Sequence, residues 1–230
     1  MKIHGLMKMT LLDFPGKVAC TVFLGGCDLR CPFCHNSELL DMGAPAEMDE
    51  EELYAFLSKR VGLLDGVAFT GGEPLLRTDL IPVMKKIRDM GFAIKLDTNG
   101  THPQRLQEIV SEGLVDYVAM DIKNSPDKYG VTVGLPDFDI TNINKSIKFL
   151  LSDAVDYEFR TTVVSPYHDE ESFQKIGPWI EGAKRYFLQE FVDRDTVKYQ
   201  GLSACTEAQM QSFLRIVTPF VKEASLRGIS

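Results

Sequence analysis

The chain has 230 residues, of which 44% are hydrophobic and 25% charged, a composition typical of a globular protein rather than a disordered one. Its 25 Lys and Arg against 33 Asp and Glu give a formal net charge of −8, which argues against a general electrostatic affinity for nucleic acid or anionic lipid. The sequence has no apolar run of roughly eighteen residues, and its start lacks the pattern of a secretory signal. We therefore expect a cytoplasmic protein with no membrane and no nucleic-acid partner.

Short apolar runs alternate with helical patterns along the chain, and no linker divides it, so we expect a single domain over residues 1–230 built from repeated βα units. The runs are continuously apolar rather than alternating, as parallel strands buried on both faces are. Residues 1–17 would form an extension before the first of them. The predicted strands are residues 18–24, 67–70, 93–97, 117–121, 157–164 and 186–192.

Helical patterns fill the segments between these runs. One follows the acidic turn 49–52, and another begins well at Pro103, because proline suits the first position of a helix. Near the end of the chain, Thr206 and Gln209 form the pattern of a capping box. We therefore expect residues 203–230 to be a C-terminal helix.

Six strands are too few for the eight of a closed TIM barrel. The predicted fold class is therefore α/β, a partial (β/α)6 TIM-like barrel of parallel strands with its chemistry at the carboxyl ends of the strands. Conspicuous polar or glycine-rich segments follow four of the runs at that end. They are residues 27–34, 71–74, 97–100 and 121–123.

Three of the five cysteines, Cys27, Cys31 and Cys34, lie within eight residues directly after the first run. Disulfide pairing at this spacing is awkward, and a reducing compartment opposes it, so metal ligation is the better interpretation. Thiolates are the usual ligands of iron–sulfur clusters, and a cluster with three protein ligands leaves one iron open to a substrate. Cys20 lies inside the first strand and Cys205 far along the chain, so neither offers itself as a fourth ligand.

A structural zinc loop completed by His35 is an alternative for the same segment. His35 directly adjoins Cys34, however, and would have difficulty closing a tetrahedron with it. An electron carrier or iron–sulfur scaffold is a second alternative, and it predicts a cluster that changes redox state without consuming a cosubstrate.

The pattern Cys-x3-Cys-x-aromatic-Cys after a first strand, with Phe33 in the aromatic place, resembles the signature of the radical S-adenosylmethionine superfamily. The resemblance implies a 4Fe-4S cluster held by Cys27, Cys31 and Cys34, whose open iron binds the amino and carboxylate groups of S-adenosylmethionine. Reductive cleavage of this cosubstrate would yield a 5′-deoxyadenosyl radical that removes a hydrogen atom from the substrate.

The strand ends resemble further motifs of that superfamily. A Gly-Gly-Glu-Pro turn brings exposed backbone to the methionine amino group, and in the activases of glycyl radical enzymes Asp-Thr-Asn-Gly and Asp-x-Lys segments place aspartates near the methionine carboxylate and, in some members, a monovalent cation. Helix caps and ion pairs are the alternative for these polar residues, Arg160 in mid-strand included. The cofactor-binding residues that the resemblance implies are Phe33, His35, Asn36, Gly71, Gly72, Glu73, Asp97, Asp121, Lys123 and Arg160.

The best match is to the branch that activates glycyl radical enzymes, particularly the anaerobic ribonucleoside-triphosphate reductase activating proteins. It is carried by residues 12–17, 27–36 and the three strand-end motifs, and it extends to about Val164. It implies abstraction of a glycine Cα hydrogen from a partner, anaerobic ribonucleoside-triphosphate reductase, with reduced flavodoxin or ferredoxin as electron donor. The alternatives are an activase of the pyruvate formate-lyase type and a small-molecule enzyme resembling 7-carboxy-7-deazaguanine synthase.

Overall fold

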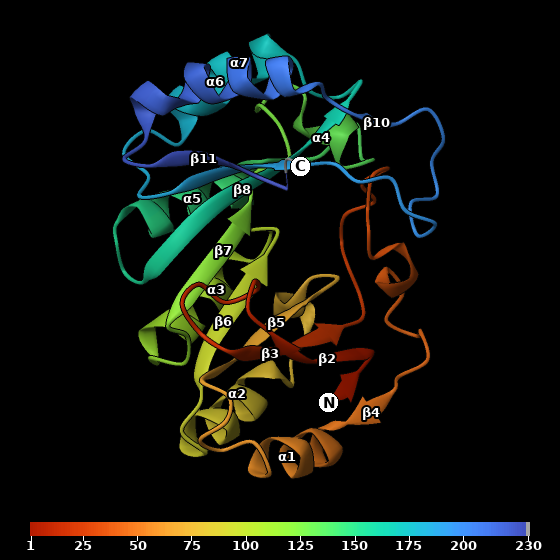
Figure 1. Cartoon of the computed structure of the whole chain (residues 1–230), viewed down its shortest axis with the longest axis vertical. Helices are drawn as coiled ribbons and strands as arrows, with labels where there is room; N and C mark the ends of the chain where they lie inside the picture. The colour runs from red at the N-terminus through yellow and green to blue at the C-terminus, as the bar shows by residue number, and fades with distance from the viewer. Residues whose placement is uncertain (229–230) are drawn as a thin grey trace.

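The computed structural model describes residues 1–228, which form a strongly curved sheet with helices packed along its outer face (Figure 1). None of the helices in that range is both long and apolar enough to cross a bilayer. The strands are β1 Lys2–Ile3, β2 Gly5–Thr10, β3 Ala19–Leu24, β4 Met48–Asp49, β5 Gly66–Gly71, β6 Ala93–Thr98, β7 Tyr117–Asp121, β8 Asp156–Ser165, β9 Tyr186–Glu190, β10 Ser203–Ala204 and β11 Ala224–Arg227. The α-helices are α1 Glu50–Ser58, α2 Leu80–Asp89, α3 Pro103–Ser111, α4 Tyr129–Thr132, α5 Thr141–Leu151, α6 Glu170–Trp179 and α7 Glu207–Val217.

The main sheet has the strand order β11-β9-β8-β7-β6-β5-β3-β2, and β10 pairs with the end of β8. Every neighbouring pair from β3 to β11 is parallel, whereas β2 runs antiparallel to β3. The order begins at β11 and ends at β2, so the described strands form an open, partial barrel. This confirms the predicted α/β fold class.

All six predicted strands are present within two residues of their expected ends. The expected C-terminal helix is wrong in its extent. The capping box of Thr206 and Gln209 starts α7 as predicted, but α7 ends at Val217, and β11 then lies parallel to β9 as a seventh parallel strand among residues 1–228. All four residues of β11 are only half-buried, so the strand carries no continuous apolar run. Residues 229 and 230 lie outside the described part of the chain.

At the amino ends of the strands, the inside of the barrel is filled by a small cluster of buried residues that includes two aromatic rings. Phe14, in the turn before β3, packs against Ala19 and Tyr117, with 6.4 Å between the two ring centroids. Gly66 makes room for it, because a Cβ there would lie 2.9 Å from the Phe14 ring. A cavity lies at the opposite end of the barrel, where the strands carry the predicted polar residues.

Candidate active site

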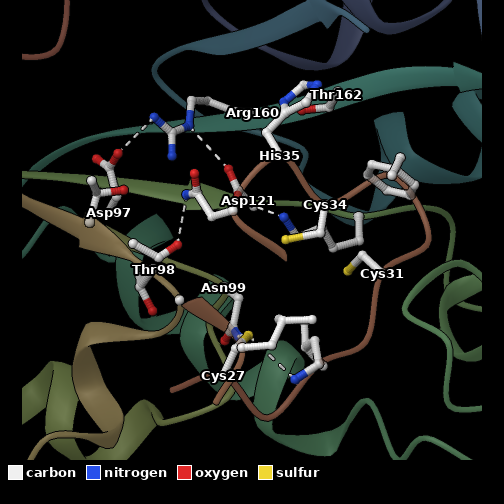
Figure 2. A pocket seen from close by; sticks show the side chains of 18 of the residues that line it. Cys27, Cys31, Cys34, His35, Asp97, Thr98, Asn99, Asp121, Arg160 and Thr162 are labelled. Carbon is white, nitrogen blue, oxygen red and sulfur yellow. Dashed lines mark hydrogen bonds and ion pairs between the residues drawn. The ribbon is translucent and has the colours of Figure 1, made fainter. Parts of the chain in front are cut away.

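A cavity at the carboxyl ends of the strands brings together side chains from the cysteine loop and from β5 to β9 (Figure 2). All but one of the predicted site residues line it. These are Cys27, Cys31, Phe33, Cys34, His35, Asn36, Gly71, Gly72, Asp97, Asp121, Lys123 and Arg160. Glu73 is the exception.

The cysteine loop is held against the end of β5 by backbone contacts that require glycine. The amide of Gly72 donates to the carbonyl of Leu24 at 2.8 Å, and the amide of Glu73 donates to the carbonyl of Gly26 at 2.7 Å. A Cβ on Gly72 would lie 2.1 Å from the carbonyl oxygen of Gly26, and Gly71 has a φ of +119°, in a region that side chains rarely adopt. The Gly-Gly-Glu turn therefore fixes the position of the cysteine loop.

Burial disfavours free ionisation of two thiols of the loop. Burial raises the pKa of the Cys27 thiol to about 12 and that of Cys31 to about 11, although the charge of Lys123 partly opposes the rise at Cys31. Coordination of a metal deprotonates a thiol outright. These two sulfurs are therefore neutral until a metal takes the place of their protons.

The donor set fits an iron–sulfur cluster better than a zinc ion. The ring of His35 stacks on Phe191 at 5.5 Å, and its Nε2 donates to the carbonyl of Val192 at 2.7 Å, so this nitrogen is already engaged. Within residues 1–228, no three His, Cys, Asp or Glu side chains converge to hold one metal ion. A four-iron cluster is held by several separate thiolates, so three thiols that line the same cavity suit it. Cys20 and Cys205 are buried outside the cavity lining.

Phe33 and Asn36 attach the cysteine loop to other strands. Phe33 is buried against Val164 and Phe191, at the ends of β8 and β9. The side-chain amide of Asn36 donates to the carbonyl of Gly71 at 2.9 Å. The segment that carries the thiols is therefore anchored both to β5 and to the far side of the barrel.

A chain of ion pairs crosses the cavity floor (Figure 2). Arg160 on β8 donates from Nε to Asp121 Oδ1 at 3.1 Å and from Nη1 to Asp97 Oδ2 at 3.3 Å. Lys123 Nζ lies 2.8 Å from Asp121 Oδ2. Arg160 thus forms the ion pairs of one interpretation that the sequence left open and also lines the cavity, while its contact with a ligand stays a prediction.

The charges in this chain stabilise one another. Burial raises the pKa of Asp121, but Lys123 and Arg160 outweigh that effect and bring its pKa down to about 2. Burial likewise opposes ionisation of Asp97, yet Arg160 and Lys95 hold its pKa below the ordinary value. Both aspartates are therefore carboxylates at neutral pH, available as hydrogen-bond acceptors at the strand ends.

Glu73 lies beneath the cavity rather than in its lining. It is fully buried, and its carboxyl accepts hydrogen bonds from the amide of Asn99 at 2.6 Å, the hydroxyl of Thr98 at 2.9 Å and the amide of Leu75 at 3.0 Å. Burial raises its pKa to about 7. Glu73 thereby fixes the turn after β6, and from this turn the side-chain nitrogen Nδ2 of Asn99 donates to the sulfur of Cys27 at 3.8 Å.

Seven residues of the cavity lining were not among the predicted contacts. They are Leu29, Leu40, Thr70, Thr98, Asn99, Thr162 and Gln189. Thr98 and Asn99 belong to the segment 97–100 that the sequence marked at a strand end. Two others had a usable signal: Thr162 stands two positions after Arg160, on the same face of a strand, and Gln189 interrupts the apolar run 186–192. A polar residue at an inward position near the end of a parallel strand is the pattern that would have found them.

Comparison with known proteins places these features in a family. The model of the Radical SAM superfamily matches residues 21–176. A Methanocaldococcus jannaschii protein, provisionally named a glycyl-radical enzyme activating enzyme, is 29% identical over 234 residues, covering 99% of this chain and 96% of that protein. The pyruvate formate-lyase-activating enzyme of Clostridium pasteurianum is 36% identical over 131 residues, 55% of this chain and 54% of that enzyme. The 7-carboxy-7-deazaguanine synthase of Koribacter versatilis is 32% identical over 141 residues, 60% of this chain and 58% of that enzyme.

The fold is shared with solved structures at much lower identity. SuiB of Streptococcus suis, bound to its precursor peptide SuiA, superposes with a TM-score of 0.70 and 13% identity over 90% of this chain and 48% of that one. The family match begins within β3 and ends within α6, so it includes the cysteine loop and most of the strand ends that build the cavity. With this match, this sheet and a thiol set that fits a 4Fe-4S cluster beside a site for S-adenosylmethionine, the chain belongs to the Radical SAM superfamily.

Proposed function

We propose that this chain activates a glycyl radical enzyme by removing a hydrogen atom from the Cα of one glycine in the partner protein. The observation that carries the proposal is the similarity to the M. jannaschii protein named as an activating enzyme of this kind. That similarity extends over 99% of this chain and 96% of that protein. It therefore includes the segments around the cavity as well as the cysteine loop that the superfamily shares.

Cys27, Cys31 and Cys34 would hold the cluster. When bound and reduced by flavodoxin or ferredoxin, the cluster supplies the electron that breaks a carbon–sulfur bond of S-adenosylmethionine, giving methionine and the 5′-deoxyadenosyl radical. Asn99 would donate to the sulfur of Cys27, as a hydrogen bond from outside the ligand set that tunes a metal ligand. Glu73 would act indirectly, by holding Asn99 in place.

The charged floor of the cavity would bind the cosubstrate. Arg160 and Lys123 only donate hydrogen bonds and carry positive charge, which suits the methionine carboxylate. Asp97 and Asp121 only accept, which suits the methionine ammonium group and the ribose hydroxyls. The remaining proposed contacts are Phe33, His35, Asn36, Gly71 and Gly72.

The proposed reaction balances without a further oxidant. The 5′-deoxyadenosyl radical takes the glycine hydrogen atom with one electron, which gives 5′-deoxyadenosine and leaves the unpaired electron on the glycine. The sequence motifs favour anaerobic ribonucleoside-triphosphate reductase as the partner. The 36% identity to a pyruvate formate-lyase-activating enzyme supports pyruvate formate-lyase as the competing partner.

The test is an anaerobic assay with each candidate partner encoded in the same genome. The reconstituted and reduced protein is mixed with S-adenosylmethionine, and 5′-deoxyadenosine and the electron paramagnetic resonance spectrum are measured with and without the partner. Partner-dependent cleavage with a glycyl doublet is the expected result, and the partner that yields the doublet identifies the substrate. The Cys31→Ala variant should give neither signal, whereas Cys205→Ala, a cysteine outside the cavity, should give both.

A small-molecule reaction is the second candidate, favoured by the 32% identity to 7-carboxy-7-deazaguanine synthase over 60% of this chain. It predicts cleavage of S-adenosylmethionine that depends on a pterin and yields no protein radical. That result would overturn the activase proposal and keep the assignment to the superfamily.

A further inference from the structure

Lys95 is a buried charge that the proposed reaction has not yet used. It lies on β6 two residues before Asp97, faces the inside of the barrel and is 2% exposed. Its ammonium group donates to Asp97 Oδ1. Its register partners are Ala68 on β5 and Tyr117 on β7, so the space for the lysine stem comes from the small side chain on β5.

Lys95 completes the pairing of the two cavity aspartates. With it, both oxygens of Asp97 contact a cation, Lys95 at Oδ1 and Arg160 at Oδ2. Both oxygens of Asp121 do so as well, Arg160 at Oδ1 and Lys123 at Oδ2. Lys95, Arg160 and Lys123 therefore leave no oxygen of these two carboxylates without a cationic partner.

Lys95 pairs with the oxygen of Asp97 that Arg160 does not contact. Buried charges are costly unless they are paired, so each carboxylate oxygen on this floor favours a cation or a hydrogen-bond donor beside it. Without Lys95, Asp97 Oδ1 would have no cationic partner among these five side chains. A monovalent metal cation could then take that place.

We infer that Lys95 is a positioning residue whose ammonium group takes the place of a monovalent metal cation at Asp97, so that S-adenosylmethionine binds to this protein without sodium or potassium. Lys95 is not part of the cavity lining and acts through the carboxylate of Asp97. The monovalent cation that the sequence resemblance suggested would have to compete with Lys95 and Arg160 for that carboxylate. The inference rests on the proposed binding of S-adenosylmethionine at this floor.

The first test uses the wild-type holoenzyme. Its affinity for S-adenosylmethionine is measured by anaerobic equilibrium dialysis at constant ionic strength in potassium, sodium or choline chloride, because constant ionic strength keeps charge screening the same. The expected affinities agree within about twofold. If S-adenosylmethionine binds only when potassium or sodium is present, the inference is wrong but the proposed function stands. If S-adenosylmethionine does not bind in any of the salts, both the proposed function and the inference are wrong.

The second test uses Lys95→Met, which keeps an unbranched stem of similar size and removes the charge. Its affinity in choline chloride should fall by roughly tenfold or more, and potassium or sodium should restore part of the loss. Lys175→Met is the matched control, because Lys175 lies on the outer helix α6 and forms its ion pairs, with Asp127 and Glu171, away from the cavity. Its affinity should equal that of the wild type in every salt.

An unchanged affinity in Lys95→Met overturns the inference. A loss that neither cation restores also overturns it, because Lys95 would then serve only to maintain the structure. Iron content and the unfolding midpoint of each variant are measured alongside. If Lys95→Met does not fold with its iron, the salt series on the wild-type holoenzyme decides the question alone.

Discussion

The attachment of the cysteine loop to β5 makes Gly72 a sensitive position. In Gly72→Ala, the new Cβ would lie 2.1 Å from the carbonyl oxygen of Gly26 and 3.2 Å from that of Leu39. Both atoms belong to the backbone, so they cannot rotate away as the end of a flexible side chain can. Gly72 does not have a positive φ, so the expected effect is one of space rather than of backbone conformation.

The cost of this change can be estimated from its parts. Overpacking of a close contact costs about 1–3 kcal/mol. Moving the loop away from β5 also breaks the hydrogen bonds from Gly72 to Leu24 and from Glu73 to Gly26, each contributing about 1 kcal/mol. Gly72→Ala should therefore lower the free energy of unfolding by about 3–5 kcal/mol, a large part of the roughly 5–15 kcal/mol that stabilises a typical protein.

Two measurements check this estimate: urea unfolding of the metal-free protein, and iron bound per chain after anaerobic reconstitution. The iron content should fall because the thiols move with the loop. Gly5→Ala is the control, since a Cβ there meets Phe23 at an ordinary 3.4 Å. If Gly72→Ala unfolds at the same urea concentration as Gly5→Ala and binds as much iron, the argument that this glycine fixes the loop is refuted.

Three further changes test the cluster ligands, the barrel interior and the charged floor. Cys31→Ala should abolish cleavage of S-adenosylmethionine and lower the iron content, whereas Cys205→Ala should change neither. Cleavage by a Cys31→Ala variant with an intact cluster would contradict the assignment of Cys31 as a cluster ligand. Arg227→Met should lower the free energy of unfolding in urea by about 1–3 kcal/mol, because the buried Glu158 would lose both hydrogen bonds from the guanidinium and keep only the one from Tyr117. Equal stability of the variant and the wild type would disprove this. Asp121 has a folded-state pKa of about 2, below its ordinary value, so its contribution to stability is present above about pH 4 and is lost as the pH falls towards 2. The wild type should therefore lose about 1 kcal/mol more than Asp121→Asn between pH 5 and pH 3, and parallel losses would contradict the pairing.

The strands show how far local composition carries a prediction. A parallel strand buried on both faces needs consecutive apolar residues, so the six central strands were visible in the sequence. β11 was missed because it is an edge strand with four half-buried residues. It is held by its pairing with β9 and by the contact of Arg227 with Glu158, which lies 69 residues away in the sequence.

In the cavity, too, the sequence predicted features that depend on neighbouring residues in the chain and missed those that depend on other strands. The spacing of the three cysteines indicated the ligands, since they lie on one short loop. The roles of Glu73 and Lys95 depended on neighbours from other strands. Glu73 turned out to hold the turn after β6, and Lys95 proved to be a partner of a cavity aspartate although it lies in the middle of a predicted strand.

The sequence alone determined the class of the sheet, the cysteine ligands and the family resemblance, because each depends on residues that are near one another in the chain. The tertiary structure decided which polar side chains share the cavity and how their charges are paired. The physical reason is the register of the parallel strands: it brings Asp97, Asp121 and Arg160 together from three strands, and no local pattern specifies which residues a neighbouring strand will place beside them.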